Sequence, residues 1–479
     1  RAGLRNASPA KKKMGNLHVL MQRAPGRKCA ILPHMEKMTE RWERLLSPLR
    51  VKVEGEAVSF EDYRPRGDAR SPFEVDYGRV VFSSAFRRLA RKTQVHPFAD
   101  VDYIHNRLTH SLEVASLCHT FAKEVQRIVR ARGDVAPERI EAIDWSMQAA
   151  GLAHDIGNPA YGHSGEEAIQ SWAEKTGARL GDDPVWNDFR VFDGNAQAFR
   201  LLARNDLRDS VYYCFTLASL GALVKHPRLA SSFAAGAPGA RKLAAFSTEE
   251  AIFRKVWDRL GLVRADGTFM RHPLSYLTEA ADDICYRILD FEDAVAMDIF
   301  SEQQVTALFR KILTPRHRDE SAGRPLQWFR GVAIRDLVEA FTAQFERHYD
   351  AILSGTLEGE LKDYLESGQR EAFDEIKRLY GVLFSHHRKV IAEIGSYGQF
   401  SGILDHYLAF LEQVPVAGDA PPFASLPTLG RQLVQLAWGD AYYEVNRPRP
   451  RAWWAHAVLD FVSGMTDDYL NTLAHRLGC

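Results

Sequence analysis

Long stretches of helical periodicity constrain this chain of 479 residues more than any other feature of its sequence. Apolar residues recur at intervals of three and four in residues 107–129, 138–156 and 272–295. This spacing places the apolar side chains on one face of an α-helix, whereas a half-buried strand alternates residue by residue. The sequence therefore predicts that buried faces of amphipathic helices build most of the core.

Strand-like alternation is confined to two short segments, residues 51–60 and residues 262–270. In the second segment, Asp266-Gly267 is a favourable two-residue hairpin turn. We therefore predict an all-α protein: a helical fold with helical insertions and one or two small β-hairpins.

The composition is that of a globular protein with a sizeable core, with 46% hydrophobic and 26% charged residues. A chain of this length suits either two or three average domains or one large helical unit. The loops rich in Gly and Pro do not separate halves of different composition, which favours a single helical body over residues 35–479. We expect its core at about residues 80–300 and a helical C-terminal part at about residues 300–479.

The first 34 residues contain eight Lys or Arg and no acidic residue. We interpret residues 1–34 as a disordered basic tail, with a nucleic-acid-binding arm as the alternative. The whole chain has 62 basic and 62 acidic residues, so no overall positive field suggests a protein that coats nucleic acid.

The five cysteines are scattered and show no Cys-x-x-Cys spacing, which is typical of a reduced, cytoplasmic protein. No segment approaches the roughly 18 uninterrupted apolar residues of a membrane-spanning helix, and no apolar signal segment follows the basic start. We expect a cytoplasmic protein with no membrane partner.

The segment HDIGNPAYGHSGEEA, residues 154–168, combines two histidines with three carboxylates. A His-Asp dipeptide alone has little value, but this one follows the apolar stretch WSMQAAGLA and precedes the helix-terminating Gly157-Asn158-Pro159. His154 and Asp155 are therefore expected at the end of a buried helix. Adjacent polar side chains in such a position need partners or a ligand.

Two other predicted helices carry polar side chains that suit the same site. Arg107 and His110 share a face at i, i+3, and Asp282, Tyr286 and Asp290 follow one stripe at i, i+4 and i+8. Two imidazoles and two carboxylates suit one divalent cation with open positions for water or substrate. The predicted metal ligands are His110, His154, Asp155 and Asp282.

Mixed nitrogen and oxygen ligands favour manganese, iron or zinc over magnesium, which prefers an octahedron of oxygens. We expect one divalent metal ion. Mn²⁺ is the first candidate, and Mg²⁺, Fe²⁺ and Zn²⁺ are the alternatives, because the sequence alone does not identify the metal. Most histidines on amphipathic helices are structural or lie at the surface, and we interpret His105, His119 and His226 in this way.

Three segments, in the order RLTHSLEVA, GLAHDIGNPAYGHSGEEA and EAADDICYRILDFEDA, resemble signature segments of the HD-domain deoxynucleoside triphosphate triphosphohydrolases. The closest likeness is to the bacterial dGTP triphosphohydrolase (dGTPase) group. Four more segments of this sequence resemble segments of the family: residues 82–95, 192–200, 216–227 and 461–470. The resemblance spans about residues 70–470. It implies an HD-domain fold and metal-dependent hydrolysis of a dNTP, with dGTP expected first, to deoxynucleoside and inorganic triphosphate.

The resemblance also implies roles for individual residues of these segments. It supports the same four metal ligands, and it prefers Asp282 to Asp283 because the family pattern has a tyrosine four residues after the ligand, as Tyr286 is here. It implies that His163 is the catalytic histidine and that Glu166, one helical turn later, is its carboxylate partner.

Substrate contacts follow from the same resemblance. Gln94 and Asp290 would hold the sugar 3′-hydroxyl, and Tyr286 would pack against the deoxyribose face, where it leaves no room for a 2′-hydroxyl. Arg107 and Lys225 would face the triphosphate, since basic side chains pair well with phosphate oxygens.

Two other functions fit part of this pattern. An HD-domain phosphodiesterase acting on another nucleotide keeps the metal ligands but gives no reason for Gln94, Tyr286 and Asp290 together. A non-catalytic nucleotide or single-stranded DNA sensor gives no reason for His163 and Glu166. Because family members form symmetric oligomers, we expect a homo-oligomer. The sequence leaves open its stoichiometry, the base preference, the native metal, and any nucleotide or single-stranded DNA effector.

Overall fold

A computed structural model describes residues 38–55, 57–62, 67–97, 103–180, 185–208, 214–233 and 242–479. The basic segment interpreted as a tail, residues 1–34, lies outside the described residues. The residues from Met38 to Cys479 form one compact unit.

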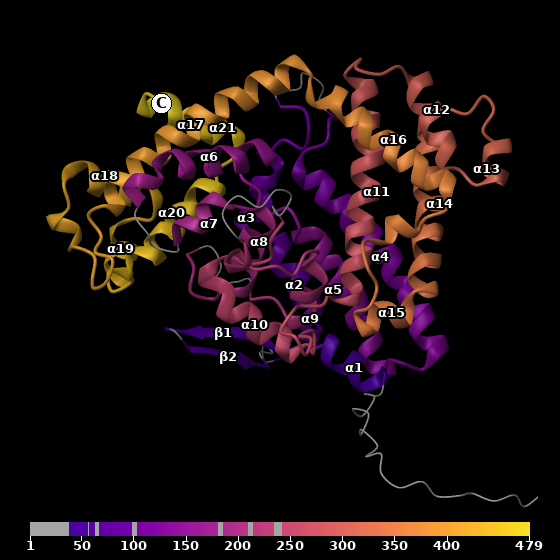
Figure 1. The fold of residues 1–479 in the computed structure, drawn as a ribbon, viewed down its shortest axis with the longest axis horizontal. Coiled ribbons are helices and arrows are strands. Elements are labelled where there is room, and N and C mark those ends of the chain that lie inside the picture. Colours follow the sequence, from indigo (N-terminus) through magenta and orange to yellow (C-terminus); the bar gives the residue numbers. More distant parts are fainter. Residues whose placement is uncertain are drawn as a thin grey trace, which may run out of the picture. The chain divides into compact units, whose positions relative to one another are not determined.

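The described chain is almost entirely helical, which confirms the all-α prediction (Figure 1). The helices up to the end of the third predicted segment are α1 (Met38–Leu45), α2 (Pro72–Val81), α3 (Ser84–Arg88), α4 (Arg107–Arg132), α5 (Ile140–Ala153), α6 (His163–Leu180), α7 (Val185–Arg190), α8 (Gly194–Ala203), α9 (Leu217–Leu223), α10 (Glu250–Arg259) and α11 (Pro273–Ala296). The later helices are α12 (Glu302–Ile312), α13 (Pro315–Asp319), α14 (Leu326–Arg347), α15 (Tyr349–Ser354), α16 (Ser367–Phe384), α17 (His387–Leu411), α18 (Thr428–Ala437), α19 (Asp440–Asn446), α20 (Arg451–Ser463) and α21 (Asp467–Leu477). None of the described helices is long and apolar enough to cross a membrane.

One small sheet interrupts the helices. Strands β1 (Arg50–Glu54) and β2 (Ala57–Glu61) pair antiparallel, as the alternation in residues 51–60 predicts. The second predicted hairpin, residues 262–270, forms a chain reversal with a single isolated bridge between Val263 and Phe269 instead of two strands. The fold is thus all-α with one small hairpin.

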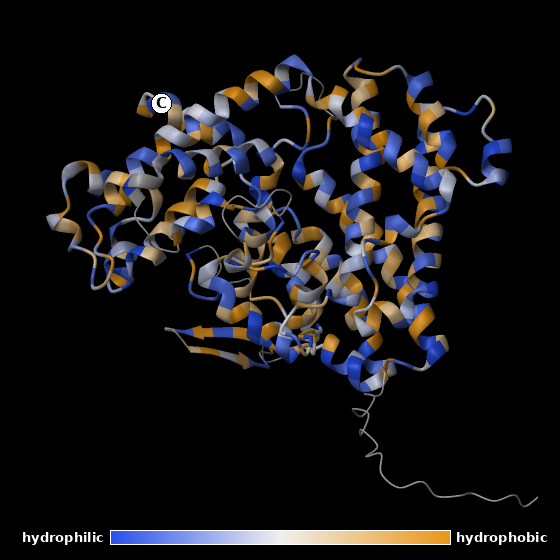
Figure 2. Ribbon diagram, in the orientation of Figure 1, coloured by the Kyte–Doolittle hydropathy of each residue, from blue (hydrophilic) through white to orange (hydrophobic). Residues whose placement is uncertain are grey.

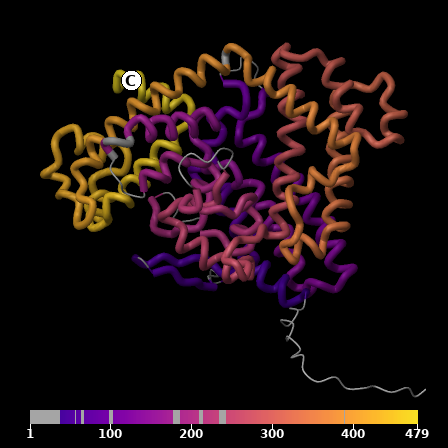
Figure 3. Tube along the Cα trace, in the orientation of Figure 1, coloured from indigo at the N-terminus to yellow at the C-terminus, as the bar shows by residue number. Residues whose placement is uncertain are grey.

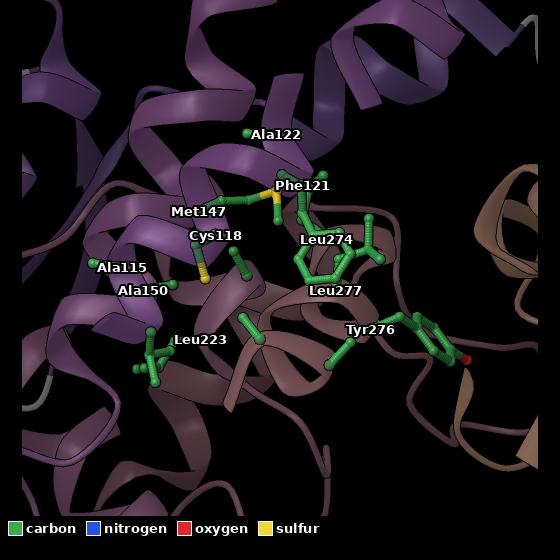
Figure 4. Packing of buried hydrophobic residues seen from close by; sticks show 14 of the residues in the cluster. Ala115, Cys118, Phe121, Ala122, Met147, Ala150, Leu223, Leu274, Tyr276 and Leu277 are labelled. Atoms are coloured by element: carbon green, nitrogen blue, oxygen red, sulfur yellow. The ribbon is translucent and has the colours of Figure 1, made fainter. Parts of the chain in front are cut away.

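Small residues let the helices that carry the motif segments approach one another closely. An added Cβ at Gly151 of α5 would lie 2.8 Å from Cys118 Sγ and 3.2 Å from the Cα atom of Ala115, both in α4. Figure 4 shows the apolar layer beside this contact, where Phe121 of α4 and Met147 of α5 lie near Leu274 and Leu277 of α11. The layer fixes α4, α5 and α11 relative to one another.

A second core cluster joins the C-terminal helices to α6 and α7. Its buried side chains include Trp172 of α6, Tyr407 of α17 and Trp454 of α20. α17 runs along α6, and α18, α20 and α21 pack against α17, so the chain from His387 onward gathers beside the helix that begins at His163 (Figure 3). Hydrophobic and hydrophilic residues lie side by side along these helices, as expected for amphipathic elements (Figure 2).

We predict that Gly157 cannot be replaced without loss of stability. An added Cβ would lie 2.1 Å from Gly194 O and 2.3 Å from Ala198 N, and both are backbone atoms of α8. Gly157→Ala should lower the free energy of unfolding by about 1–3 kcal/mol, because the overlap must be relieved by moving the backbone. Gly331→Ala is the matched control: no atom lies within 4 Å of its added Cβ on α14, so it should be stabilising by up to about 1 kcal/mol. Denaturant titration checks both changes, and a Gly157→Ala protein as stable as the wild type would contradict the prediction.

Candidate active site and metal centre

His154 lies directly after the last residue of α5, and a backbone hydrogen bond orients its imidazole. Nδ1 donates to Gly151 O at 2.7 Å, while Nε2 is buried and has no hydrogen-bond partner in the described structure. Burial lowers the pKa of His154, which favours the neutral imidazole. A histidine whose Nδ1 is held by a carbonyl presents the Nε2 lone pair, as metal-binding histidines do.

His154 is one of three candidate ligands that lie close together; the other two come from α4 and α11. His110 Nε2 of α4 lies 3.1 Å from Asp282 Oδ1 of α11, and His154 Nε2 lies 3.5 Å from the same oxygen. One ligand atom from each residue lies within 4.8 Å of the other two. Metal bonds of about 2.0–2.2 Å can span such separations, so the donor set fits one divalent ion.

Asp155 lies beside this group but is held by other side chains. Its Oδ1 is 3.5 Å from His154 Nε2 and accepts a hydrogen bond from Asn158 Nδ2, while its Oδ2 accepts one from Arg107 Nη1 at 2.7 Å. Burial raises the pKa of Asp155, but the charges of Arg107 and of the neighbouring His154 and His110 together outweigh it and hold the pKa at about 2. The structure therefore brings an ionised Asp155 next to the three-residue group and not into it.

The two adjacent acids of α11 have different partners. Asp282 faces the histidines, and its second oxygen pairs with Lys225 Nζ. Burial raises the pKa of Asp282, but Lys225 and the two histidines together outweigh it, and the pKa lies well below the usual range. Asp283 instead pairs with Arg287, 2.5 Å away, and lies 3.5 Å from Lys362. Of the two acids, Asp282 is the one positioned with the histidines.

The chain reverses sharply between Asp155 and α6. Tyr161 and Gly162 both adopt left-handed backbone angles, with φ of 58° and 56°. An added Cβ at Gly162 would lie 2.3 Å from Arg107 Nη2, so the loop passes directly over this guanidinium. The reversal brings the start of α6 back towards the candidate metal centre.

His163 and Glu166 form a hydrogen-bonded pair at the start of α6. His163 Nδ1 lies 2.8 Å from Glu166 Oε2, and Glu166 Oε1 accepts from Gly194 N at 2.7 Å, where α8 begins. The His163 side chain is 91% exposed, whereas that of Glu166 is 13% exposed. The hydrogen bond that His163 donates to Glu166 is the main cause of the raised pKa of His163. A buried carboxylate thus orients an accessible imidazole.

The candidate sugar-binding residues lie on α11 and on the segment after α3. The hydroxyl of Tyr380 in α16 donates to Asp290 Oδ2 at 2.9 Å, and its ring stacks on Tyr286 with centroids 4.2 Å apart. Burial raises the pKa of Asp290 to about 7. Gln94 has a buried Oε1 without a hydrogen-bond partner. The structure therefore brings Tyr286 and Asp290 together around Tyr380, while no described contact joins Gln94 to them.

Several residues that support the site were missed by the sequence analysis. Tyr380 lies in a region, residues 296–460, to which no chemistry was assigned, and a tyrosine on an amphipathic helix carries no signal of its own. Lys92, which is buried, donates to Asn158 O and to Ser463 O. Burial lowers the pKa of Lys92 to about 7. Its polar neighbours in sequence, Arg91 and Thr93, gave no sign that this lysine is buried.

A cavity adjoins the candidate metal centre. It is small and partly open to solvent, and it is lined by His154, Lys225 and His226 together with Asn195 and Ala198 of α8. The candidate ligand His154 and the candidate phosphate-binding Lys225 therefore face a common space.

Comparisons with known proteins agree with this geometry. The HD domain family matches residues 107–297, from the start of α4 to the end of α11. A deoxyguanosinetriphosphate triphosphohydrolase-like protein of Pseudomonas aeruginosa is 35% identical over 465 residues, which cover 91% of this chain and 98% of the relative. The chain belongs to the HD-domain deoxyguanosinetriphosphate triphosphohydrolase family. This membership confirms the resemblance drawn from the motif segments.

Other members of the triphosphohydrolase family match over most of their length. A protein of Synechocystis with the same "-like" name is 33% identical over 459 residues, covering 91% of this chain and 98% of its own. The deoxyguanosinetriphosphate triphosphohydrolase of Serratia proteamaculans is 29% identical over 489 residues, covering 85% and 93%.

We predict that Glu166 controls the titration of His163 in this family member. Glu166→Gln should lower the pKa of His163, because a neutral amide no longer favours the charged imidazolium. The pH dependence of the His163 ring-proton NMR signal, assigned with His163→Ala, measures the shift. Glu167→Gln is the control, since Glu167 accepts from Tyr397 and not from His163. An unchanged pKa of His163 in Glu166→Gln would show that the pair does not form in solution.

Proposed function

We propose that this protein hydrolyses deoxynucleoside triphosphates, with dGTP as the first expected substrate, to a deoxynucleoside and inorganic triphosphate. The observation that supports this most strongly is the convergence of His110, His154 and Asp282 from three helices beside a cavity. It occurs in a chain whose relatives carry the name deoxyguanosinetriphosphate triphosphohydrolase.

We propose His110, His154, Asp155 and Asp282 as the ligands of one divalent metal ion, with Mn²⁺ as the first candidate. A bound divalent ion supplies Lewis acidity at a phosphoryl oxygen. Arg107 and Lys225 now pair with Asp155 and Asp282. With these carboxylates engaged as ligands, both basic side chains are free to pair with the triphosphate, to which they are well suited.

His163 is the proposed proton donor. Its Nδ1 is engaged by Glu166, so Nε2 is the nitrogen available for proton transfer. In the proposed reaction, water attacks the α-phosphorus, the bond from this phosphorus to O5′ breaks, and a proton from His163 goes to O5′ of the leaving deoxynucleoside. The oxygen of the water stays on the triphosphate, and the proton that it releases to solvent restores the protonated His163 for the next turnover. The raised pKa of His163 increases the protonated fraction near neutral pH, which favours donation.

The sugar contacts are proposed for the cluster around Tyr380. Asp290 already accepts a hydrogen bond from Tyr380, and its second oxygen is proposed to hold the 3′-hydroxyl. The unpartnered Oε1 of Gln94 provides another acceptor. Tyr286, which is fixed by stacking on Tyr380, is proposed to block C2′ and so to exclude ribose.

Product identification tests the proposed reaction. The Mn²⁺-loaded protein is incubated with each dNTP and each rNTP, and products are separated by anion-exchange chromatography and assigned by ³¹P NMR. Inorganic triphosphate and deoxynucleoside, with dNTPs preferred over rNTPs, are the expected products. Monophosphate with pyrophosphate, or hydrolysis of other phosphodiesters alone, would indicate a different HD-domain hydrolase. Binding without turnover would indicate a sensor.

We predict that metal binding distinguishes the two adjacent acids of α11. Asp282→Asn should abolish both hydrolysis and Mn²⁺ binding at the proposed centre, because the carboxylate facing the two histidines is lost. Asp283→Asn is the matched control and should retain both, since Asp283 pairs with Arg287 and Lys362. Electron paramagnetic resonance of free Mn²⁺ measures binding. The reverse result would transfer the ligand role to Asp283.

We predict that Asp290 acts on the 3′-hydroxyl. Asp290→Ala should lower kcat/KM for dGTP by about 10- to 100-fold, because the variant has no acceptor for the 3′-hydroxyl. The loss should be much smaller for 2′,3′-dideoxy-GTP, which has no 3′-hydroxyl. Steady-state kinetics measure the loss in kcat/KM for dGTP and for 2′,3′-dideoxy-GTP. Equal losses would mean that Asp290 only supports Tyr380 and the helix.

A further inference from the structure

A second group of one histidine and two carboxylates lies next to the candidate metal centre. One ligand atom from each of His226, Glu279 and Glu360 lies within 4.8 Å of the other two. His226 directly follows Lys225, and Glu279 lies one helical turn before Asp282 on α11. The two groups therefore share α11, and His226 adjoins Lys225, which pairs with Asp282 of the first group.

His226 has a nitrogen that the fold leaves unexplained. Nε2 is buried and lacks a hydrogen-bond partner among the described residues, and it lies 3.8 Å from Glu279 Oε1. This distance is too long for a hydrogen bond. It is close to the roughly 3.4 Å that separates two ligands of a tetrahedral ion with bonds of about 2.1 Å. The interpretation of His226 as a satisfied structural or surface histidine does not account for this atom.

His226 is also in the protonation state that binds metals. Burial lowers the pKa of His226 to about 3, and the positive charges of Lys242 and Arg271 act in the same direction. The imidazole is therefore neutral near neutral pH and retains a lone pair for a cation.

The two carboxylates leave oxygens facing this nitrogen. Arg271 Nη1 donates to Glu279 Oε2 at 2.9 Å, which leaves Oε1 directed towards His226. Burial raises the pKa of Glu279, Arg271 opposes this effect, and the negative charge of Glu360 adds to it. A cation placed between the two carboxylates would reduce their repulsion.

Basic side chains around the group compete with an added cation, but one of them has an alternative partner. Lys362 Nζ pairs with Glu360 Oε2 and also lies 3.5 Å from Asp283 Oδ2. If a metal ion takes Glu360, Lys362 can keep a carboxylate partner by moving to Asp283. Arg271 does not need to move, since it holds the other oxygen of Glu279.

One member of the group borders the cavity described above. His226 lines that cavity together with His154 and Lys225. A cation bound by His226 would therefore lie beside the space that adjoins the candidate metal centre.

We propose that His226, Glu279 and Glu360 form a second site for a divalent first-row metal ion, one helical turn along α11 from the first centre. One imidazole and two carboxylates with open coordination positions suit Mn²⁺, Fe²⁺ or Zn²⁺ better than Mg²⁺. The site does not depend on the proposed reaction, because its residues and their geometry are independent of which phosphate bond is cleaved.

Metal stoichiometry tests this site without any activity measurement. The full chain is dialysed against excess Mn²⁺, and bound metal per chain is measured by mass spectrometry and by electron paramagnetic resonance. We expect two ions in the wild-type protein and one in His226→Gln and in Glu360→Gln. Asp282→Asn should lose the first ion and keep the second. The double variant Asp282→Asn with His226→Gln should bind none.

His119→Gln is the matched control and should bind two ions. His119, in the middle of α4, pairs with Asp144 of α5 and belongs to neither group. Circular dichroism verifies folding, and Glu360→Gln at the start of a short 3-10 helix decides the question if His226→Gln does not fold. A wild-type protein with one ion, or variants of His226 and Glu360 that both keep two, would overturn the second site. A failure of triphosphate release would leave these counts unchanged, so the two proposals fail separately.

Discussion

The close packing of α4 against α5 is the contact on which the rest of the site depends. Gly151 has no room for even one extra carbon, because Cys118 and Ala115 of α4 already lie against it. This approach places His110, near the start of α4, beside His154, which follows the end of α5, with ring centroids 5.2 Å apart. The same Gly151 supplies the carbonyl that orients His154. One glycine thus sets both the separation of the helices and the direction of a candidate ligand.

The charges at the site are buried, and burial of unpaired charge is costly. The fold meets this cost with matched pairs: Arg107 with Asp155, and Lys225 with Asp282. The same basic side chains have the chemistry to bind phosphate. The arrangement therefore combines a stable polar interior with groups that can exchange one anionic partner for another. The network around Glu279 and Glu360 extends this arrangement along the next turn of α11.

Much of the fold could be predicted from the sequence because its information is local. The periodicity of residues 107–129 and 272–295 corresponds to α4 and α11, and the motif segments identified the family before any contact was known. Residues 262–270 form only one bridge, since a good turn sequence does not by itself supply a partner strand. His105 and His119, interpreted as structural or surface histidines, pair with the acids Asp293 and Asp144.

The contacts made by the site could not be predicted, because they join segments far apart in the chain. Tyr380 reaches Asp290 across 90 residues, and Lys92 reaches Ser463 across 371. No local pattern distinguishes such a tyrosine or lysine from its neighbours. The grouping of His226 Nε2 with Glu279 and Glu360 could likewise not be predicted, because it arises only when the segment after α9, α11 and the segment before α16 pack together.

The location of a bound metal tests the central claim most directly. Crystals grown with Mn²⁺ and measured at the manganese absorption edge should show an anomalous difference peak about 2.0–2.2 Å from His110 Nε2, His154 Nε2 and an Asp282 oxygen, with Asp155 completing the set. In that structure Lys225 should have left Asp282. A well-ordered site with Asp282 still paired to Lys225 and no peak between the two histidines would contradict the account.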